Sequence, residues 1–300
     1  MKTTSTSSLV LLTALSLLTV ACSDGAKDDS GIDDISGADG GDGADGGDGA
    51  DGGDGADGGD GADGGDGADG GDGGDATGQV RLAHFGVFPG DMDTDVDIFV
   101  NGAASGITFG FKATTGYVDL PVGSYTFDVV PSGGTIEQSV FTVADFPIAD
   151  GDAWSVFASG YVMPMGDNNA FTIGAFPDDR MGIPAGNVRL NIIHAAALAP
   201  LDPVDVWVVD DMCAPVGDAP LLPGFAFGAV AANVDLPSTA INVGFDIGAN
   251  ATVDACFKVP DVGITDEVIN VYAINNDAGL PTLVAHLPDG TSAEILPEAM

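Results

Sequence analysis

The chain has 300 residues, of which 46 are glycine, 46 are aspartate or glutamate and only 7 are lysine or arginine, which gives a formal net charge of −39. Binding of nucleic acid or of anionic lipid headgroups needs clustered basic side chains that displace counterions from phosphates. The five basic residues after Thr77 are scattered, namely Arg81, Lys112, Arg180, Arg189 and Lys258. The composition therefore excludes nucleic acid as a partner, whereas the abundant Val, Leu and Ile after Thr77 predict a folded core.

Residues 1–21 have the organisation of an export signal. A polar stretch after Lys2 precedes the apolar run Leu9–Val20, which is too short to span a bilayer. The run ends in Leu-Thr-Val-Ala before Cys22, which resembles the bacterial lipobox. This resemblance implies a lipoprotein signal peptide, a mature chain acylated at Cys22 and a membrane partner through that lipid anchor. By the same resemblance Ser23 favours the outer membrane, with the periplasmic or the external face left open; the alternative is an ordinary signal peptide and an incidental cysteine.

Residues 22–78 form an acidic linker of low complexity. The hexad Gly-Ala-Asp-Gly-Gly-Asp occurs six times in succession from Gly37 to Asp72. Glycine loses the most conformational entropy on ordering, and the repeat has no apolar side chain larger than alanine to offset that loss. A calcium-binding β-roll would need a large apolar residue in each turn. The linker is therefore predicted to be a disordered tether that holds the following domains away from a membrane.

After the tether, short runs rich in Val, Ile, Phe and Thr are broken every 8 to 12 residues by Gly, Pro, Asn or Asp, which is typical of all-β domains. Helical periodicity is nearly absent. The turn-rich segment Pro177–Gly186 is predicted to separate two domains. In the first of them, strands are predicted near Val80–Phe85, Val96–Val100, Ile107–Phe111, Tyr117–Leu120, Ser124–Val130, Gln138–Val143, Ala153–Tyr161 and Ala170–Phe176.

The second half repeats the first in three paired segments. Val80–Leu82 matches Val188–Leu190, Val96–Val100 matches Val204–Val208, and Val118–Pro121 matches Val234–Pro237. The first two pairs share the offset 108, and the third pair needs eight residues more, which indicates an insertion around Met212–Leu222. We therefore predict an all-β fold with two tandem Ig-like antiparallel β-sandwich domains, 79–183 and 184–300, after the disordered Gly/Asp-rich tether.

The same segments resemble a known family of bacterial extracytoplasmic domains. Val80-Arg-Leu, then Val96-Asp-Ile-Phe-Val-Asn-Gly, then Tyr117-Val-Asp-Leu-Pro-Val-Gly-Ser-Tyr-Thr are similar to the domain of unknown function numbered 4397. The resemblance covers most of 79–134 and, more weakly, 187–245. It implies a sandwich fold and an envelope or lipid-anchored protein, and the family has no established catalytic motif.

Cys213 and Cys256 are the only cysteines besides Cys22. An exported chain enters an oxidising compartment, so we expect these two cysteines to form a disulfide. The alternative is two unpaired buried thiols. Neither cysteine lies in a recognisable nucleophile motif.

Alternate aspartates at Asp91, Asp93 and Asp95 form the candidate metal site, because carboxylates at this spacing in a loop can converge on calcium. The segment departs from an EF-hand, since Val96 stands where the turn glycine belongs and Gly102 where the bidentate glutamate belongs. The alternative is a solvated row of aspartates that binds no metal. Calcium is therefore a candidate cofactor, not an established one.

No serine lies in a nucleophile elbow. The three histidines, His84, His194 and His286, are too scattered for a metal triad. We therefore expect that the protein is not an enzyme. The expected function is a lipid-anchored envelope protein that displays two non-catalytic modules for structural or binding roles. Its partner would be an envelope or extracellular polymer or protein. The alternatives are calcium-dependent adhesion or glycan binding, and a hydrolase built on loop aspartates. An exposed aromatic groove would favour glycans, and two facing carboxylates in a pocket would favour the hydrolase.

Overall fold

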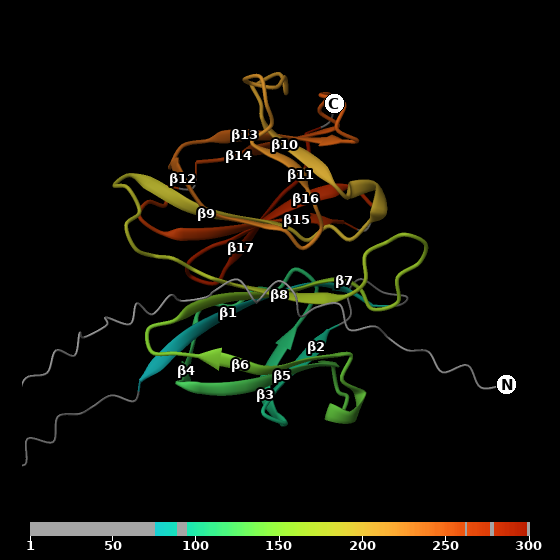
Figure 1. Ribbon diagram of the computed structural model, residues 1–300, viewed down its shortest axis with the longest axis vertical. Helices are drawn as coiled ribbons and strands as arrows, with labels where there is room; N and C mark the ends of the chain where they lie inside the picture. Colours follow the sequence, from blue (N-terminus) through green and yellow to red (C-terminus); the bar gives the residue numbers. More distant parts are fainter. Residues whose placement is uncertain (1–75, 89–94, 262, 277–278, 299–300) are drawn as a thin grey trace, which may run out of the picture. The chain divides into compact units, whose positions relative to one another are not determined.

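The computed structural model describes residues 76–88, 95–261, 263–276 and 279–298, which fold into two β-sandwiches (Figure 1). The predicted signal peptide 1–21, Cys22 and the linker up to residue 75 lie outside the described residues. Within the described residues, no helix is long and apolar enough to cross a membrane. The all-β prediction is confirmed for this part of the chain, where the helices are two short 3₁₀ turns.

The first sandwich consists of two four-stranded sheets with the orders β4-β1-β7-β8 and β3-β2-β5-β6. Its elements are β1 Thr77–Val87, β2 Val96–Val100, β3 Ala103–Phe109, β4 Val118–Pro121, β5 Gly123–Pro131, η1 Ile136–Gln138, β6 Phe141–Ile148, β7 Ala153–Tyr161 and β8 Thr172–Pro177.

The second sandwich has a five-stranded sheet with the order β12-β9-β15-β16-β17 and a four-stranded sheet with the order β11-β10-β13-β14. Its elements are β9 Asn187–His194, η2 Ala199–Leu201, β10 Val204–Val208, β11 Leu222–Phe225, β12 Val230–Pro237, β13 Ile241–Ile247, β14 Ala255–Val259, β15 Val268–Asn275, β16 Pro281–His286 and β17 Ser292–Ile295.

The strand orders show the duplication that the paired segments predict. Each of β1 to β8 has its counterpart eight strands later, and the two sheets of each copy have the same order; β17 is the addition in the second copy. One pair in each copy, β1 with β7 and β9 with β15, is parallel, which departs from the purely antiparallel arrangement expected. In the first copy the chain passes through β6 in the opposite sheet before β7, so that β7 enters beside β1 in the same direction.

Alternation along the strands gives each sandwich two different faces, because successive side chains of a strand point to opposite sides of the sheet. In β1, Val80 and Leu82 face the interior of the first sandwich, while Arg81, Ala83 and Phe85 face the second sandwich. Between the sandwiches lies a shared apolar core. Its buried members are Ala83, Phe85, Phe157 and Phe176 from the first copy and Ile193, Ala195, Tyr272, Ile274 and Val284 from the second.

The shared core has a consequence for the domain limits. The strands of the two copies are separated by residues 178–186, in the turn-rich segment that the sequence indicates. Tyr272 of the second copy nevertheless packs against two rings of the first, with centroid distances of 4.7 Å to Phe85 and 5.7 Å to Phe157. The limits 79–183 and 184–300 stay a prediction, because burial of these side chains depends on both copies.

The predicted disulfide is present. Cys213, in the loop after β10, is bonded to Cys256 of β14, with a Cα–Cα distance of 5.9 Å. Cys256 is fully buried and packs with Trp207 and Val209. The bond therefore ties a loop of the second sandwich to that sandwich's own core.

Candidate functional site

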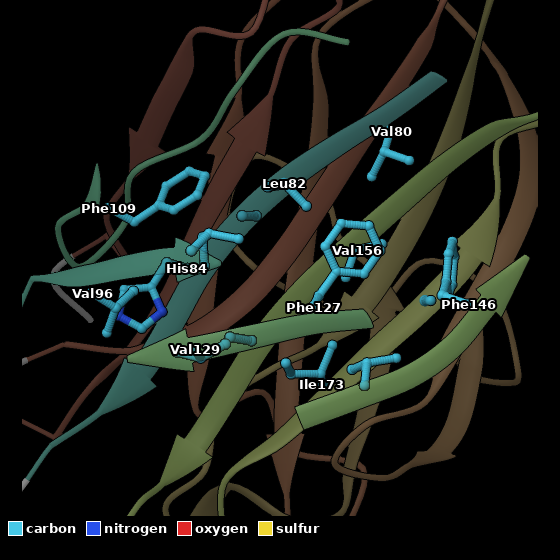
Figure 2. Close-up of a pocket in the computed structure, with 15 residues that line it drawn as sticks. Val80, Leu82, His84, Val96, Phe109, Phe127, Val129, Phe146, Val156 and Ile173 are labelled. Atoms are coloured by element: carbon cyan, nitrogen blue, oxygen red, sulfur yellow. The ribbon is translucent and has the colours of Figure 1, made fainter. Parts of the chain in front are cut away.

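The candidate site is an apolar cavity of about 100 Å³ between the two sheets of the first sandwich. Figure 2 shows the lining side chains converging from both sheets. Apart from the ring of His84, the wall consists of aliphatic and aromatic side chains. Representative members are Leu82, Val156 and Ile173 from one sheet and Val96, Phe127 and Phe146 from the other. Such a wall accepts hydrocarbon and offers few hydrogen bonds to a polar ligand.

A row of half-buried aromatic rings borders this cavity. Tyr125 stacks on Phe127 with centroids 6.0 Å apart, and Phe127 meets Phe146 edge to face at 5.9 Å. Phe146 in turn meets Trp154 at 5.2 Å. The polar atoms at the two ends of the row are used internally, because Tyr125 Oη donates to the Pro121 carbonyl and Trp154 Nε1 donates to Asp152. The row thus forms an apolar wall with its polar groups occupied.

Strands β6 and β8, each an edge strand of its sheet, both contribute side chains to the cavity. Val143 and Phe146 of β6 and Ile173 of β8 line it and are only half-buried, and Ala175 of β8 is exposed. No described strand pairs with the outer side of β8. The cavity-lining side chains on these two edge strands are therefore partly accessible to solvent.

In the second sandwich an additional strand covers the corresponding edge. Strand β17 pairs with β16, the counterpart of β8, and Ile295 of β17 packs against the core of the sandwich. Farther along, the Glu298 N–H donates to the Cys256 carbonyl of β14, the counterpart of β6, at 2.8 Å. Lys258 and Glu298 form an exposed ion pair at 3.6 Å. The C-terminal segment thus covers the edge of β16 and reaches β14, beside a groove that Lys258, Val259 and Ile295 line.

The described part of the second sandwich has pockets as well. The cavity between its sheets measures about 60 Å³, and a wider groove of about 470 Å³ lies along Leu236, Val259 and Leu296. A shallower hollow of about 340 Å³ has Asp202 and Asp205 in its rim. Both carboxylates of this hollow already accept hydrogen bonds from the backbone, Asp202 from the Phe227 N–H and Asp205 from the Gly224 N–H. These hydrogen bonds hold the loops that carry Phe227 and Gly224 against the two aspartates.

A buried polar network joins the two sandwiches and was not foreseen from the sequence. Arg81 Nε lies 3.0 Å from Asp178 Oδ2, and neither side chain is accessible to solvent. The remaining groups are satisfied: Arg81 donates to Ser155 and to Asn270 of the second copy, and Asp178 accepts from Ser155, Tyr117 and Asn191. Burial raises the pKa of the Tyr117 hydroxyl, and the adjacent Asp178 raises it further.

The second copy uses its own arginine differently. Arg189 binds Asp235 with two parallel hydrogen bonds of 2.7 and 2.8 Å, and the Asp235 side chain is 24% exposed. The hydrogen bonds from Arg189 hold the pKa of the Asp235 carboxyl below its usual value. Arg189 also donates to the carbonyls of Asp179 and Met181 in the linker. Both Val-Arg-Leu motifs thus place an arginine between the sandwiches, but only Arg81 is sealed from water.

The candidate calcium residues fall mostly outside the described part. Asp91 and Asp93 lie outside the described residues, and the backbone carbonyl of Asp95 accepts the Ser132 N–H at 2.9 Å. The neighbouring Asp97 accepts hydrogen bonds from Thr108 and from the Gly133 N–H, and these bonds, that of Thr108 first, lower its pKa. Over the described ranges, no three His, Cys, Asp or Glu side chains gather to hold a metal ion.

The histidines lie inside the fold. His84 contributes to the cavity wall, and His194 Nε2 lies 2.7 Å from the Leu201 carbonyl. His286 Nε2 lies 2.7 Å from the Thr115 carbonyl of the first sandwich. Burial, and then the charge of Arg81, lower the pKa of His286 to about 4, and burial lowers the pKa of His194 as well. His286 is therefore neutral at physiological pH and donates a hydrogen bond across the two copies.

Comparison with known proteins extends the resemblance seen in the sequence. Residues 78–207 match the family model described as "Domain of unknown function (DUF4397)", so that the match spans the whole first sandwich and reaches into β10. No curated protein matches. Among solved structures, the chain is similar to streptococcal family 41 carbohydrate-binding modules studied for α-glucan recognition, at 13% identity and a TM-score of 0.21, covering 67% of this chain and 94% of that one. It is also similar to the Bacillus anthracis TIE protein, at 13% identity and a TM-score of 0.19, covering 74% of this chain and 44% of that one. Residues 78–207 of the chain therefore belong to the DUF4397 family of domains.

Proposed function

We propose that this protein is a non-catalytic binding module displayed at the bacterial outer membrane, and that the cavity of the first sandwich is its binding site. The observation that carries the proposal is the difference between the two copies. In the second copy β17 pairs with the edge of β16, whereas in the first copy no described strand pairs with the outer side of β8, which lines the cavity. Access to a hydrocarbon-lined interior is what an apolar ligand group requires.

The chemistry of the cavity supports binding without catalysis. General acid–base or nucleophilic catalysis needs side chains with transferable protons or activated nucleophiles within reach of the substrate. The Asp152 carboxylate, at one end of the aromatic row, accepts structural hydrogen bonds from Trp154 and from the Ala149 N–H. The aromatic rings and aliphatic side chains of the wall supply contact area instead.

Display at the membrane rests on the N-terminal sequence. Acyl chains at Cys22 would anchor the chain, and the glycine-aspartate linker would space the sandwiches from the bilayer. Mass spectrometry of the mature N-terminus should find an acylated Cys22. A Cys22→Ser variant should be recovered without acyl chains and released from the membrane fraction; an unmodified wild-type cysteine would contradict the anchor.

The cavity itself is tested with xenon, which enters dry apolar cavities of this size class. Xenon should shift the methyl resonances of Val156 and Ile173 in the first sandwich in a saturable manner. Ala158, which lines the cavity and is buried, offers the control: Ala158→Leu adds volume at the wall and should weaken the xenon response. Methyl groups that do not respond in the wild-type protein would overturn the proposed site.

A further inference from the structure

The outer side of β8 carries backbone groups available for pairing. In an antiparallel pair, residues alternate between bonding inward to the partner strand and pointing outward. The Asp178 N–H donates to the Ala153 carbonyl at 2.8 Å, which sets the phase of the ladder between β7 and β8. Ile173 and Ala175 therefore present their N–H and C=O groups to the open side. Pro177 stands at the next outward position, where a missing N–H is tolerated.

The second copy shows what a strand does at this edge. In β16, Leu283 and Ala285 occupy the outward positions, and β17 pairs with them through Ile295 and Ala293. Ala285 is the counterpart of Ile173, since Ala285 lies opposite Val271 of β15 and Ile173 lies opposite Ala158 of β7. Strand β17 gives both a ladder of backbone bonds and an aliphatic side chain that packs on the core.

We propose that β8 is a β-augmentation site, at which an extended segment of a partner protein adds antiparallel to β8 and places an aliphatic side chain in the cavity of the first sandwich. The proposal rests on the proposed function of that cavity as a binding site, and it specifies the occupant. Backbone bonds to Ile173 and Ala175 supply affinity, and the cavity selects alternate aliphatic residues in the added strand. The seated β17 is the pattern for this mode of binding.

The side chains and charge expected of the partner strand follow from the composition and charge of this protein. The glycine-aspartate hexads of the tether have no side chain larger than alanine, so they cannot fill the cavity. The chain carries a net charge of −39, and Asp145 on the neighbouring strand β6 is exposed. A strand with aliphatic residues at alternate positions and basic flanks is therefore the complementary partner.

The test uses the whole chain with Cys22→Ser, so that it is not acylated, and a fluorescent synthetic peptide Lys-Thr-Ile-Thr-Ile-Thr-Lys. A peptide with Asn in place of both Ile has the same charge and is the peptide control. Fluorescence anisotropy should show saturable binding of the Ile peptide and at least tenfold weaker binding of the Asn peptide. Equal binding of both peptides would indicate charge attraction alone and overturn the proposal.

Two variants at one position separate the backbone contribution from the side chain. Ala175→Pro removes an outward N–H and should weaken the Ile peptide at least tenfold, whereas Ala175→Ser keeps the N–H and should stay within about twofold. Circular dichroism and the unfolding temperature establish that both variants are folded. If Ala175→Pro binds like the wild type, β8 is not the docking edge.

The outcomes distinguish the two proposals. A xenon response without peptide binding would keep the cavity as a site and overturn the augmentation. Loss of both would overturn the proposed function. Analytical ultracentrifugation of the same samples tests the remaining occupant, because a dimer of the chain that is abolished by Ala175→Pro would make a second copy, and not a partner protein, the strand donor.

Discussion

The two sandwiches have the same eight-strand plan and differ at their borders. In the second copy β17 pairs with β16 and the bond between Cys213 and Cys256 ties a loop to the core, whereas in the first copy no described strand pairs with the outer side of β8. Strand order and the inward face of each strand follow from the hydrophobic pattern that both copies share. This difference is the basis on which we propose a binding role for the first copy.

The arginines of the two Val-Arg-Leu motifs show the same divergence within the interface. Arg189 binds Asp235, which belongs to the matching motif of its own copy. In the first copy the counterpart of Asp235 is Asp119, which accepts from Gln79 instead, while Arg81 pairs with Asp178 from the linker. One duplicated motif thus stabilises its own sandwich, and the other joins the two sandwiches.

The largest expected effect comes from breaking the buried pair. Arg81→Met leaves the Asp178 carboxylate buried without its cation, and loss of one partner of a buried ion pair costs about 3 to 5 kcal/mol. Urea unfolding followed by Trp fluorescence should show this loss. Arg189→Met is the matched control and should cost clearly less, because water reaches Asp235. Equal losses for the two variants would show that Arg81 has no special role between the copies.

The disulfide is the second largest difference between the copies. Replacing Cys213 and Cys256 together by alanine opens a loop with a sequence separation of 43, which should lower the free energy of unfolding by about 3 to 4 kcal/mol. Hydrogen exchange should localise the lost protection to β10, β13 and β14. Dithiothreitol should destabilise the wild-type chain and leave the double variant unchanged; a variant that is still sensitive to the reductant would contradict this account.

The strands with the clearest pattern were predicted with the bounds that the structure has, Val96–Val100 and Ala153–Tyr161. Both are compact runs of β-branched, aromatic and small residues bounded by turn formers. The strand expected at Ile107–Phe111 instead spans Ala103–Phe109. The sequence signal for the earlier start is the Asn-Gly pair at Asn101 and Gly102, which is typical of a tight hairpin turn. In the structure both residues have the positive φ values that such a turn needs, 50° and 81°.

The candidate site is harder to predict, because it depends on what lies beside the strands. The apolar residues of β6 and β8 look like ordinary core positions in the sequence. Their exposure follows from the absence of a strand beyond β8 in the described fold, which becomes visible only when β17 is seen against β16. Asp178 likewise belongs to a turn-rich segment in the sequence, and its burial arises when the second copy covers it.

The pH dependence tests a contact that β16 makes and β8 does not. In the second copy, His286 of β16 lies opposite Asn270 of β15. The corresponding position of β8 is Gly174, which lies opposite Phe157 of β7. The pKa of His286 falls from 6.5 in the unfolded chain to about 4 in the fold, so the unfolded chain binds more protons between these values. The contribution of neutral His286 to the free energy of unfolding is complete above pH 6.5. It is lost as the pH falls toward 4, which lowers the free energy of unfolding by about 3 kcal/mol. The difference in unfolding free energy between wild type and His286→Gln should change over this window; parallel curves would contradict the burial of a neutral imidazole.

The smallest expected effect tests whether β17 seals the second sandwich. Full truncation of a buried isoleucine to alanine costs about 2 to 5 kcal/mol, and Ile295 is half-buried, so Ile295→Ala should cost about 1 to 2 kcal/mol in urea unfolding. The neighbouring Leu296 is 61% exposed and serves as the control, because Leu296→Ala should change stability by less than about 0.5 kcal/mol. Removal of the Ile295 side chain should also widen the groove that this side chain lines and strengthen the xenon response of the second sandwich. If Ile295→Ala costs no more than Leu296→Ala and the xenon response is unchanged, then β17 does not cover the core, and the uncovered edge of the first copy loses its significance as a docking site.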